Sequence, residues 1–309
     1  MKRPQILLIG NGINRAFHSD SWNELLNSVN KRSDRYDAEE LRCPETLKAI
    51  LVTGDNVDKA LKSKKAQLAG LGTDKPPEQL ALLRRLLDIG FDGILTTNYS
   101  YELETAALGA DKISESVLKS CQRHTNEIKR CEANFMLHTY NSVMYNGAEQ
   151  RIWHVHGEAR KPDSMILGHY YYGTLLGKIL DINKKRGNSY YNMQKNNGEQ
   201  HSIGAWTDAF ILGDLYILGF GFGYAEIEMW WLLNRKKRER ARVGKTYFYE
   251  LNPPGKNNAE KLDLLELMKA KTIVLDVENN DWKGAYSRAI DDIAGKVRKN
   301  KNADRDSKK

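Results

Sequence analysis

Residues 5–15 read QILLIGNGINR, and this stretch decides the fold. Residues 6–9 are all apolar, which is typical of a strand buried on both faces of a parallel sheet. Gly10 and Gly12 follow directly and precede the helix-like segment 21–26. Glycines at such a turn let the backbone approach a pyrophosphate, which a helix N-terminus favours. Arg15 replaces the third glycine of the dehydrogenase fingerprint, and a plain strand-to-helix turn is the alternative.

Further apolar runs along the chain predict more strands of the same kind. They lie at residues 93–97, 151–156, 214–220, 246–251 and 272–277. Segments with helical spacing separate them, such as Leu80, Leu83, Leu86 and Leu87, or Leu262, Leu265, Leu267 and Met268. Strands that alternate with helices predict a doubly wound, Rossmann-like α/β fold with a mainly parallel six-stranded sheet.

Three polar, charged stretches interrupt this alternation, at about 28–75, 105–150 and 170–205. We expect mostly helical insertions there, and residues 170–198, rich in Tyr, Asn and Gly, suggest a flap over a site. The expected organisation is one domain over residues 1–295, followed by a basic tail at 296–309.

The composition is that of an ordinary globular protein, with 40% apolar and 28% charged residues and 7 prolines. No apolar run approaches the roughly 20 residues that span a bilayer, and the first apolar run is a strand without a signal-peptide cleavage site. Cys43, Cys121 and Cys131 form no CxxC pair, which argues against a disulfide scaffold and a zinc ribbon. We expect a cytoplasmic protein without contact to membranes.

The net charge of +8 is concentrated in two segments. Residues 234–245 and 296–309 each carry seven Lys or Arg against few acids, so the rest of the chain is slightly acidic. Such patches could contact nucleic acid or an acidic partner protein. The alternative is a solvated helix end and a frayed tail.

Polar residues stand where the strands are expected to end, and open α/β sheets bind ligands beyond the carboxyl ends of their strands. Thr97 and Asn98 follow the second strand. The Asn98 amide can donate to and accept from ribose hydroxyls or a water. Turn formation, with Ser100 capping the next helix, is the alternative.

The later strands end in residues of similar interest. His154 and His156 end the third strand, where alternation predicts that both side chains point to one face. Histidine suits proton transfer near neutral pH, although a hydrogen-bonded core histidine is the alternative. No third ligand has metal-binding spacing, so we expect no metal. Gly219 and Gly221 would expose peptide N–H groups after the fourth strand, and Asn252 ends the fifth.

Taken in chain order, these residues resemble the sirtuin-like (SIR2-like) NAD-binding family, and most closely its bacterial branch that degrades NAD in antiphage defence. The resemblance rests on Gly10-x-Gly12-x-Asn14, Thr96-Thr97-Asn98-Tyr99, His156-Gly157, Gly219-x-Gly221 and Asn252. It implies that NAD is the substrate and is bound by Gly10, Gly12, Asn14, Arg15, Thr97, Gly219, Gly221 and Asn252. It also implies that Asn98 contacts the nicotinamide ribose and a water, and that His156 is the catalytic base.

The chain departs from the deacylases of this family, because three scattered cysteines cannot build their four-cysteine zinc module. Ser100 also stands where an acid is common, with Glu102 nearby. The resemblance therefore implies an NAD+ hydrolase that releases nicotinamide and ADP-ribose, depleting NAD in abortive infection. Family members are often controlled by self-assembly or by a partner, so we expect a homo-oligomer or a partner such as a nucleic-acid-associated ATPase or sensor.

Two other functions remain open at this point. A module that binds NAD or ADP-ribose without turnover would not need the Asn98/His156 pair. A nicotinamide-dependent oxidoreductase would need the third glycine that Arg15 replaces, and an acidic second strand end that the sequence lacks.

Overall fold

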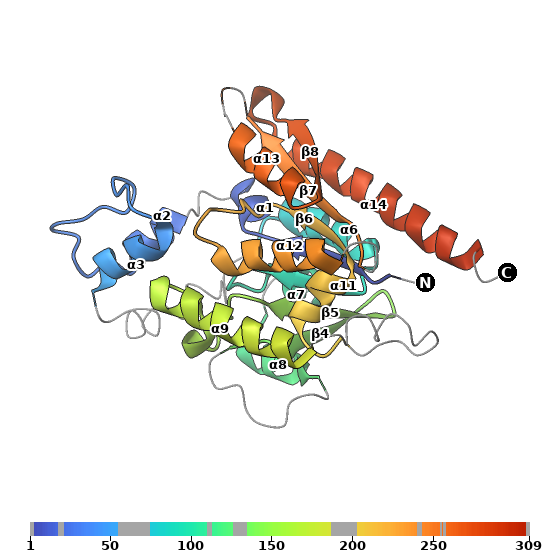
Figure 1. The fold of residues 1–309 in the computed structure, drawn as a ribbon, viewed down its shortest axis with the longest axis horizontal. Helices are drawn as coiled ribbons and strands as arrows, with labels where there is room; N and C mark the ends of the chain where they lie inside the picture. Colours follow the sequence, from blue (N-terminus) through green and yellow to red (C-terminus); the bar gives the residue numbers. More distant parts are fainter. Residues whose placement is uncertain are drawn as a thin grey trace.

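Six adjacent strands run parallel in the sheet of the computed structural model, and they correspond to the six apolar runs of the sequence (Figure 1). These strands are β1 (Gln5–Ile9), β2 (Gly93–Thr96), β5 (Ala148–His154), β6 (Asp214–Leu218), β7 (Thr246–Asn252) and β8 (Ala270–Asp276). The structure describes residues 3–17, 22–54, 75–109, 113–125, 135–186, 203–239, 243–253, 255 and 258–306.

The order of the parallel strands is β5-β2-β1-β6-β7-β8. Numbered by their appearance in the chain, they run 3-2-1-4-5-6, which is the order of doubly wound dinucleotide-binding sheets. The order reverses between β1 and β6, which pair in parallel from Gln5↔Asp214 to Ile9↔Leu218. In folds of this order the ligand lies beyond the carboxyl ends of the strands at the reversal.

Among the described residues the sheet has eight strands, so the prediction of six is wrong in number. The two additional strands, β3 (Gln122–His124) and β4 (Thr139–Tyr145), pair antiparallel at the β5 edge, inside the stretch expected to be mostly helical. β4 reads TYNSVMY and mostly alternates buried with less buried residues. A strand with one polar face lacks the continuous apolar run by which the other strands were predicted. The helices of this stretch are α7 (Glu102–Leu108) and α8 (Glu115–Cys121).

Helices cover both faces of the sheet, each over its own apolar core. One face is covered by α1 (Gly12–Arg15), α6 (Pro77–Asp88), α7 and α14 (Trp282–Asp306). The other face is covered by α9 (His169–Arg186), α11 (Trp206–Leu212), α12 (Ile227–Glu239) and α13 (Ala259–Leu267). Figure 1 shows α9 and α12 side by side. The insertion at 170–205 is thus helical up to Arg186. Residues 187–202, which include the rest of the flap expected at 170–198, lie outside the described residues.

A small helical unit projects from the sheet at the left of Figure 1. It contains α2 (Trp22–Ser28) and α3 (Glu45–Thr53). α2 ends where the insertion expected at 28–75 begins, and α3 is the helix that the structure describes inside it. Its apolar side chains pack against Tyr99, Tyr101 and Met165, which follow β2 and β5. The unit therefore lies over the carboxyl ends of these two strands.

The two basic segments are mostly helical where the structure describes them. α12 carries the first up to Glu239, and α14 continues through the second to Asp306. Near its end α14 is fastened to the turn between α6 and β2, since Lys301 Nζ donates to the carbonyl of Gly90 at 2.6 Å. Cys43 and Cys121 are free thiols, and Cys131 lies outside the described residues.

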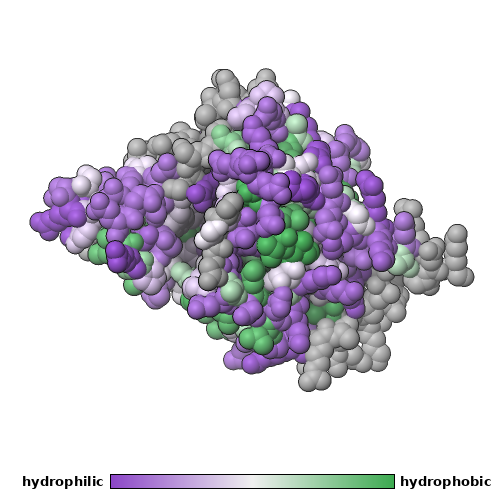
Figure 2. Space-filling view, turned by 90° about the horizontal axis from the view of Figure 1, so that it is seen from above, coloured by the Kyte–Doolittle hydropathy of each residue, from purple (hydrophilic) through white to green (hydrophobic). Residues whose placement is uncertain are grey.

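No helix among the described residues combines the length and apolar character needed to cross a membrane. Seen from above, hydrophilic side chains cover most of the surface and surround a smaller hydrophobic area in the middle of this face (Figure 2).

Candidate functional site

Two glycine turns meet where the strand order reverses. Gly12 N donates to the Gly219 carbonyl at 2.8 Å, and Gly10 N donates to the Leu218 carbonyl at 3.1 Å. A Cβ on Gly10 would lie 2.6 Å from the Gly219 oxygen, and a Cβ on Gly12 would lie 2.7 Å from it. The glycines are therefore required by the contact of the turn after β1 with the turn after β6. This contact brings three of the predicted NAD-binding residues together at the expected edge.

The other predicted residues of this region have different surroundings. Asn14 is buried, donates to Asn11 Oδ1 at 3.0 Å and accepts from Gln79 Nε2 at 2.9 Å, so its amide fastens the turn to α6. Arg15 is exposed on α1. Gly221 lies in open space, with nothing within 4 Å of an added Cβ.

Asn252 ends β7, two strands from β1, and its carbonyl accepts from Val277 N at 3.0 Å. The edge from β5 to β7 covers four strand spacings, or about 19 Å.

Beyond β2, the chain presents Thr97 and Asn98 at the same edge. Thr97 N donates to the Ile9 carbonyl at 3.1 Å, and Asn98 N donates to Thr96 Oγ1 at 3.1 Å. The side-chain oxygen of Asn98 is buried and has no hydrogen-bond partner among the described residues. A buried carbonyl without a donor is costly, and a bound ligand or water would satisfy it. Ser100 does not cap α7, which begins after Tyr101 without a side-chain cap.

His154 and His156 do not share a face, so this prediction is wrong. His154 is the last residue of β5, and the chain then turns, with Gly157 at φ +87° and its N–H donating to the His154 carbonyl. Alternation of side chains holds only within a strand. His154 consequently contacts Glu104 of α7, whereas His156 contacts Glu228 of α12, and these helices cover opposite faces.

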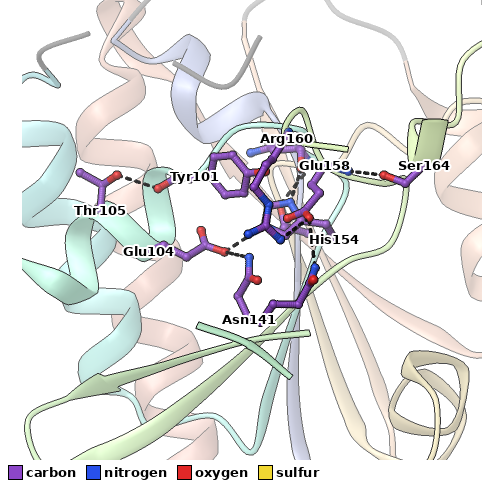
Figure 3. A network of polar contacts seen from close by, with 11 residues as sticks. Tyr101, Glu104, Thr105, Asn141, His154, Glu158, Arg160 and Ser164 are labelled. Atoms are coloured by element: carbon purple, nitrogen blue, oxygen red, sulfur yellow. Dashed lines mark hydrogen bonds and ion pairs between the residues drawn. The ribbon is translucent and has the colours of Figure 1, made fainter. Parts of the chain in front are cut away.

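His154 is a doubly protonated imidazolium that supports the strand ends. Its Nε2 lies 2.9 Å from a Glu104 carboxylate oxygen and its Nδ1 lies 2.8 Å from the Asn98 carbonyl (Figure 3). Both partners only accept, so both ring nitrogens must carry a proton. Burial lowers the pKa of His154, but the charges of Glu104 and Glu158 and the two hydrogen bonds raise it further, to about 9. His154 thus holds the backbone of Asn98.

Figure 3 shows the polar network that surrounds this histidine. Asn141 of β4 donates to Glu104 at 2.9 Å, and Arg160 forms an ion pair with Glu158 at 2.8 Å. Strand β4, absent from the predicted fold, therefore stabilises the carboxylate that keeps His154 charged.

His156 lies on the other side of the strand ends, buried between two carboxylates. Its Nε2 is 2.9 Å from Glu228 Oε1 and 3.6 Å from Glu226 Oε2. The ring also packs edge-on against Tyr172 of α9, whose hydroxyl donates to Glu226 Oε1 at 3.5 Å. Both carboxylates contact Nε2, which leaves Nδ1 as the nitrogen that a bound molecule would meet. The hydroxyl of Tyr99, next to Asn98, donates to the Ile166 carbonyl. The N–H of Ile166 in turn donates to the His156 carbonyl.

The charges of this cluster depend on one another. Burial lowers the pKa of His156, whereas the Glu226 and Glu228 carboxylates raise it, and the net pKa is above the ordinary value. Burial raises the pKa of Glu226 to about 7; His156 opposes this rise and Glu228 adds to it. A histidine that takes up a proton here is stabilised by two carboxylates, whereas the histidine of a serine-protease triad has one.

The same three residues form a donor set that could hold a metal ion. One ligand atom from each of His156, Glu226 and Glu228 lies within 4.8 Å of the others. One nitrogen and two carboxylate oxygens suit Zn²⁺ or Mn²⁺. Sequence spacing could not reveal this set, because the histidine and the acids are about 70 residues apart.

No family model and no curated protein matches this chain. The resemblance seen in the sequence therefore remains a prediction.

Sequence reasoning did not single out Glu226, Glu228 or Tyr172. The acids stand at the start of α12, where carboxylates are common because they favour the helix dipole. Their position directly after a glycine-rich strand end was the available signal. Glu228 is also fully buried, and an acid is rarely fully buried unless it is paired, here with His156.

Proposed function

We propose that this protein is an NAD+ hydrolase that cleaves the bond between nicotinamide and ribose, releasing nicotinamide and ADP-ribose. The proposal places the pyrophosphate at the turns of Gly10, Gly12 and Gly219 and the reacting ribose near Asn98 and His156. The sequence resemblance to SIR2-like proteins supports it and suggests NAD depletion in antiphage defence as the biological role.

One observation carries the proposal: Asn98 and His156 follow neighbouring parallel strands at the edge where the glycine turns of β1 and β6 also meet. β2 and β5 pair at Thr96↔His154, and each of the two residues lies two positions beyond this pair. The order of the strands makes this edge the ligand-binding edge of the fold. Mere packing does not account for the unpartnered Asn98 oxygen or for the carboxylates around His156.

The chemistry matches these groups. The nicotinamide of NAD+ leaves as a neutral ring, so the leaving group needs no acid. The site must orient the ribose and a water, and it must accept one proton. The Asn98 amide would orient a ribose hydroxyl or the water, and His156 would accept the proton. Binding of the remote pyrophosphate supplies affinity that can be used to orient the reacting bond.

The test is incubation of the purified chain with NAD+ and separation of the products by chromatography. The wild type should release nicotinamide and ADP-ribose in equal amounts, and His156→Ala should lose this activity while still binding ADP-ribose. Wild-type turnover by His156→Ala would refute the catalytic assignment. Binding of NAD+ or ADP-ribose without turnover, also in the presence of partners, would instead indicate a sensor module.

A further inference from the structure

The two acids beside His156 differ in how they face the site. Glu228 has a fully buried side chain and lies 2.9 Å from Nε2, as expected of a residue that positions the ring. Glu226 lies farther from Nε2, at 3.6 Å, and 21% of its side chain is exposed. Of the two acids, Glu226 is therefore the one whose side chain is partly open to the surface.

The cluster carries more acceptors than the described residues satisfy. Glu226 Oε2 and Glu228 Oε2 are buried without a hydrogen-bond partner in the described structure. Four titratable groups face Glu226, namely His156, Glu228, Tyr172 and Tyr99. Burial raises the pKa of both tyrosines, which keeps them neutral. Two carboxylates thus face one imidazole, and when both are ionised, above the Glu226 pKa of about 7, the surplus negative charge favours a cation.

We propose that Glu226 is a catalytic residue of this site, whose carboxylate stabilises the positive charge of a pyridinium N-riboside and of its transition state, while Glu228 positions His156. This inference rests on the proposed function and adds the charge that the substrate must carry. The favoured substrates are ribosides of a cationic pyridinium ring, such as NAD+, and reduced dihydropyridine nucleotides are disfavoured.

The step balances as a hydrolysis. The bond between ribose C1′ and the ring nitrogen breaks, and its electron pair neutralises the pyridinium, so nicotinamide leaves uncharged. Positive charge develops at C1′ and the ring oxygen, where Glu226 stabilises it. The water oxygen then bonds to C1′, and the proton that it loses passes to His156 and from there to solvent.

The experiment compares Glu226→Gln with wild type, with Glu226→Asp as the conservative variant. Nicotinamide release by Glu226→Gln should fall by about 100-fold, which is typical for loss of one electrostatic group, and Glu226→Asp should recover part of it. The wild-type rate should depend on the ionisation of both His156 and Glu226, whose pKa is about 7, and only the limb of the His156 base should remain in Glu226→Gln. Glu149→Gln is the matched control, because Glu149 lies at the opposite end of β5 and should change neither property.

Binding supplies a second readout that does not need turnover. NAD+ and NADH differ in ring charge, and the wild type should bind NAD+ at least about tenfold more tightly, a preference that Glu226→Gln reduces. Wild-type turnover by Glu226→Gln, or reduced turnover with an unchanged pH profile, would overturn the inference while the proposed hydrolysis stands. If the wild type releases no nicotinamide, the proposed hydrolysis fails and the catalytic role of Glu226 fails with it. Binding then decides the recognition of ring charge by Glu226: an NAD+ preference lost in Glu226→Gln supports it, and equal affinities overturn it.

Discussion

Replacing Glu226 with Gln should make the folded protein more stable at alkaline pH. Burial raises the pKa of Glu226 from 4.5 to about 7, so the folded state disfavours the ionised carboxylate. A rise of this size corresponds to about 3 kcal/mol, and partial exposure reduces it to about 1–3 kcal/mol. Gln keeps the size of the side chain and an oxygen that can accept from Tyr172.

The pH dependence of this gain follows from the sign of the shift. Below pH 4.5 Glu226 is protonated in both the folded and the unfolded state, so its ionisation costs nothing. Between pH 4.5 and about 7 the unfolded state loses its proton first, and the cost to the folded state grows. Above about 7 the cost is complete, and the stabilisation by Glu226→Gln should be largest there.

The assay is urea unfolding of wild type and Glu226→Gln at pH 4.5 and pH 8.5. The variant should be more stable by about 1–3 kcal/mol at pH 8.5 and nearly equal to wild type at pH 4.5. Glu228→Gln is the contrasting control: it weakens a buried ion pair at 2.9 Å and should be destabilising. A Glu226→Gln protein that is less stable than wild type at pH 8.5, or equally stabilised at both pH values, would refute the reasoning.

Three further predictions concern the supports of the site. The raised pKa of His154, about 9 against an ordinary 6.5, stabilises the fold fully below pH 6.5, and this contribution of about 3 kcal/mol is lost as pH rises through about 9. Unfolding titrations should show this loss in wild type and not in His154→Gln; parallel curves would contradict it. Gly10→Ala should lower the unfolding free energy by about 2 kcal/mol or more, because its Cβ would lie 2.6 Å from the Gly219 oxygen, whereas Gly221→Ala, in open space, should change it by less than about 1 kcal/mol. EDTA should leave nicotinamide release unchanged, because the account assigns the carboxylate charge to the substrate; loss of activity that Zn²⁺ or Mn²⁺ restores would identify a metal at His156 instead.

The parallel part of the fold could be predicted mainly because its central strands, such as β1 and β6, are buried on both faces. Such strands appear as short, nearly continuous apolar runs, as in residues 6–9 and 215–218. β3 and β4 were not predicted, because β3 is short and β4 is half-exposed, so their sequences carry no such run. β3 pairs with β4, and β4 forms a hairpin with β5 through Asn146 and Gly147, both at positive φ, so this Asn-Gly dipeptide was the local signal for β4.

The site was predictable where it depends on local backbone demands. Gly10, Gly12 and Gly219 appeared at strand ends, and the structure brings them into contact. The roles of the two histidines could not be separated, because this depends on the turn at Gly157 and on partners from α7 and α12. Glu226 joins His156 only through the crossover of the chain after β6, which no spacing in the sequence reveals.

Nicotinamide release from NAD+ by wild type, Asn98→Ala and His156→Ala, measured by chromatography on the same day and at the same protein concentration, tests the central claim most directly. The account predicts release by wild type and a loss of at least about 100-fold in both variants, with ADP-ribose binding retained. Equal release by wild type and His156→Ala would contradict it.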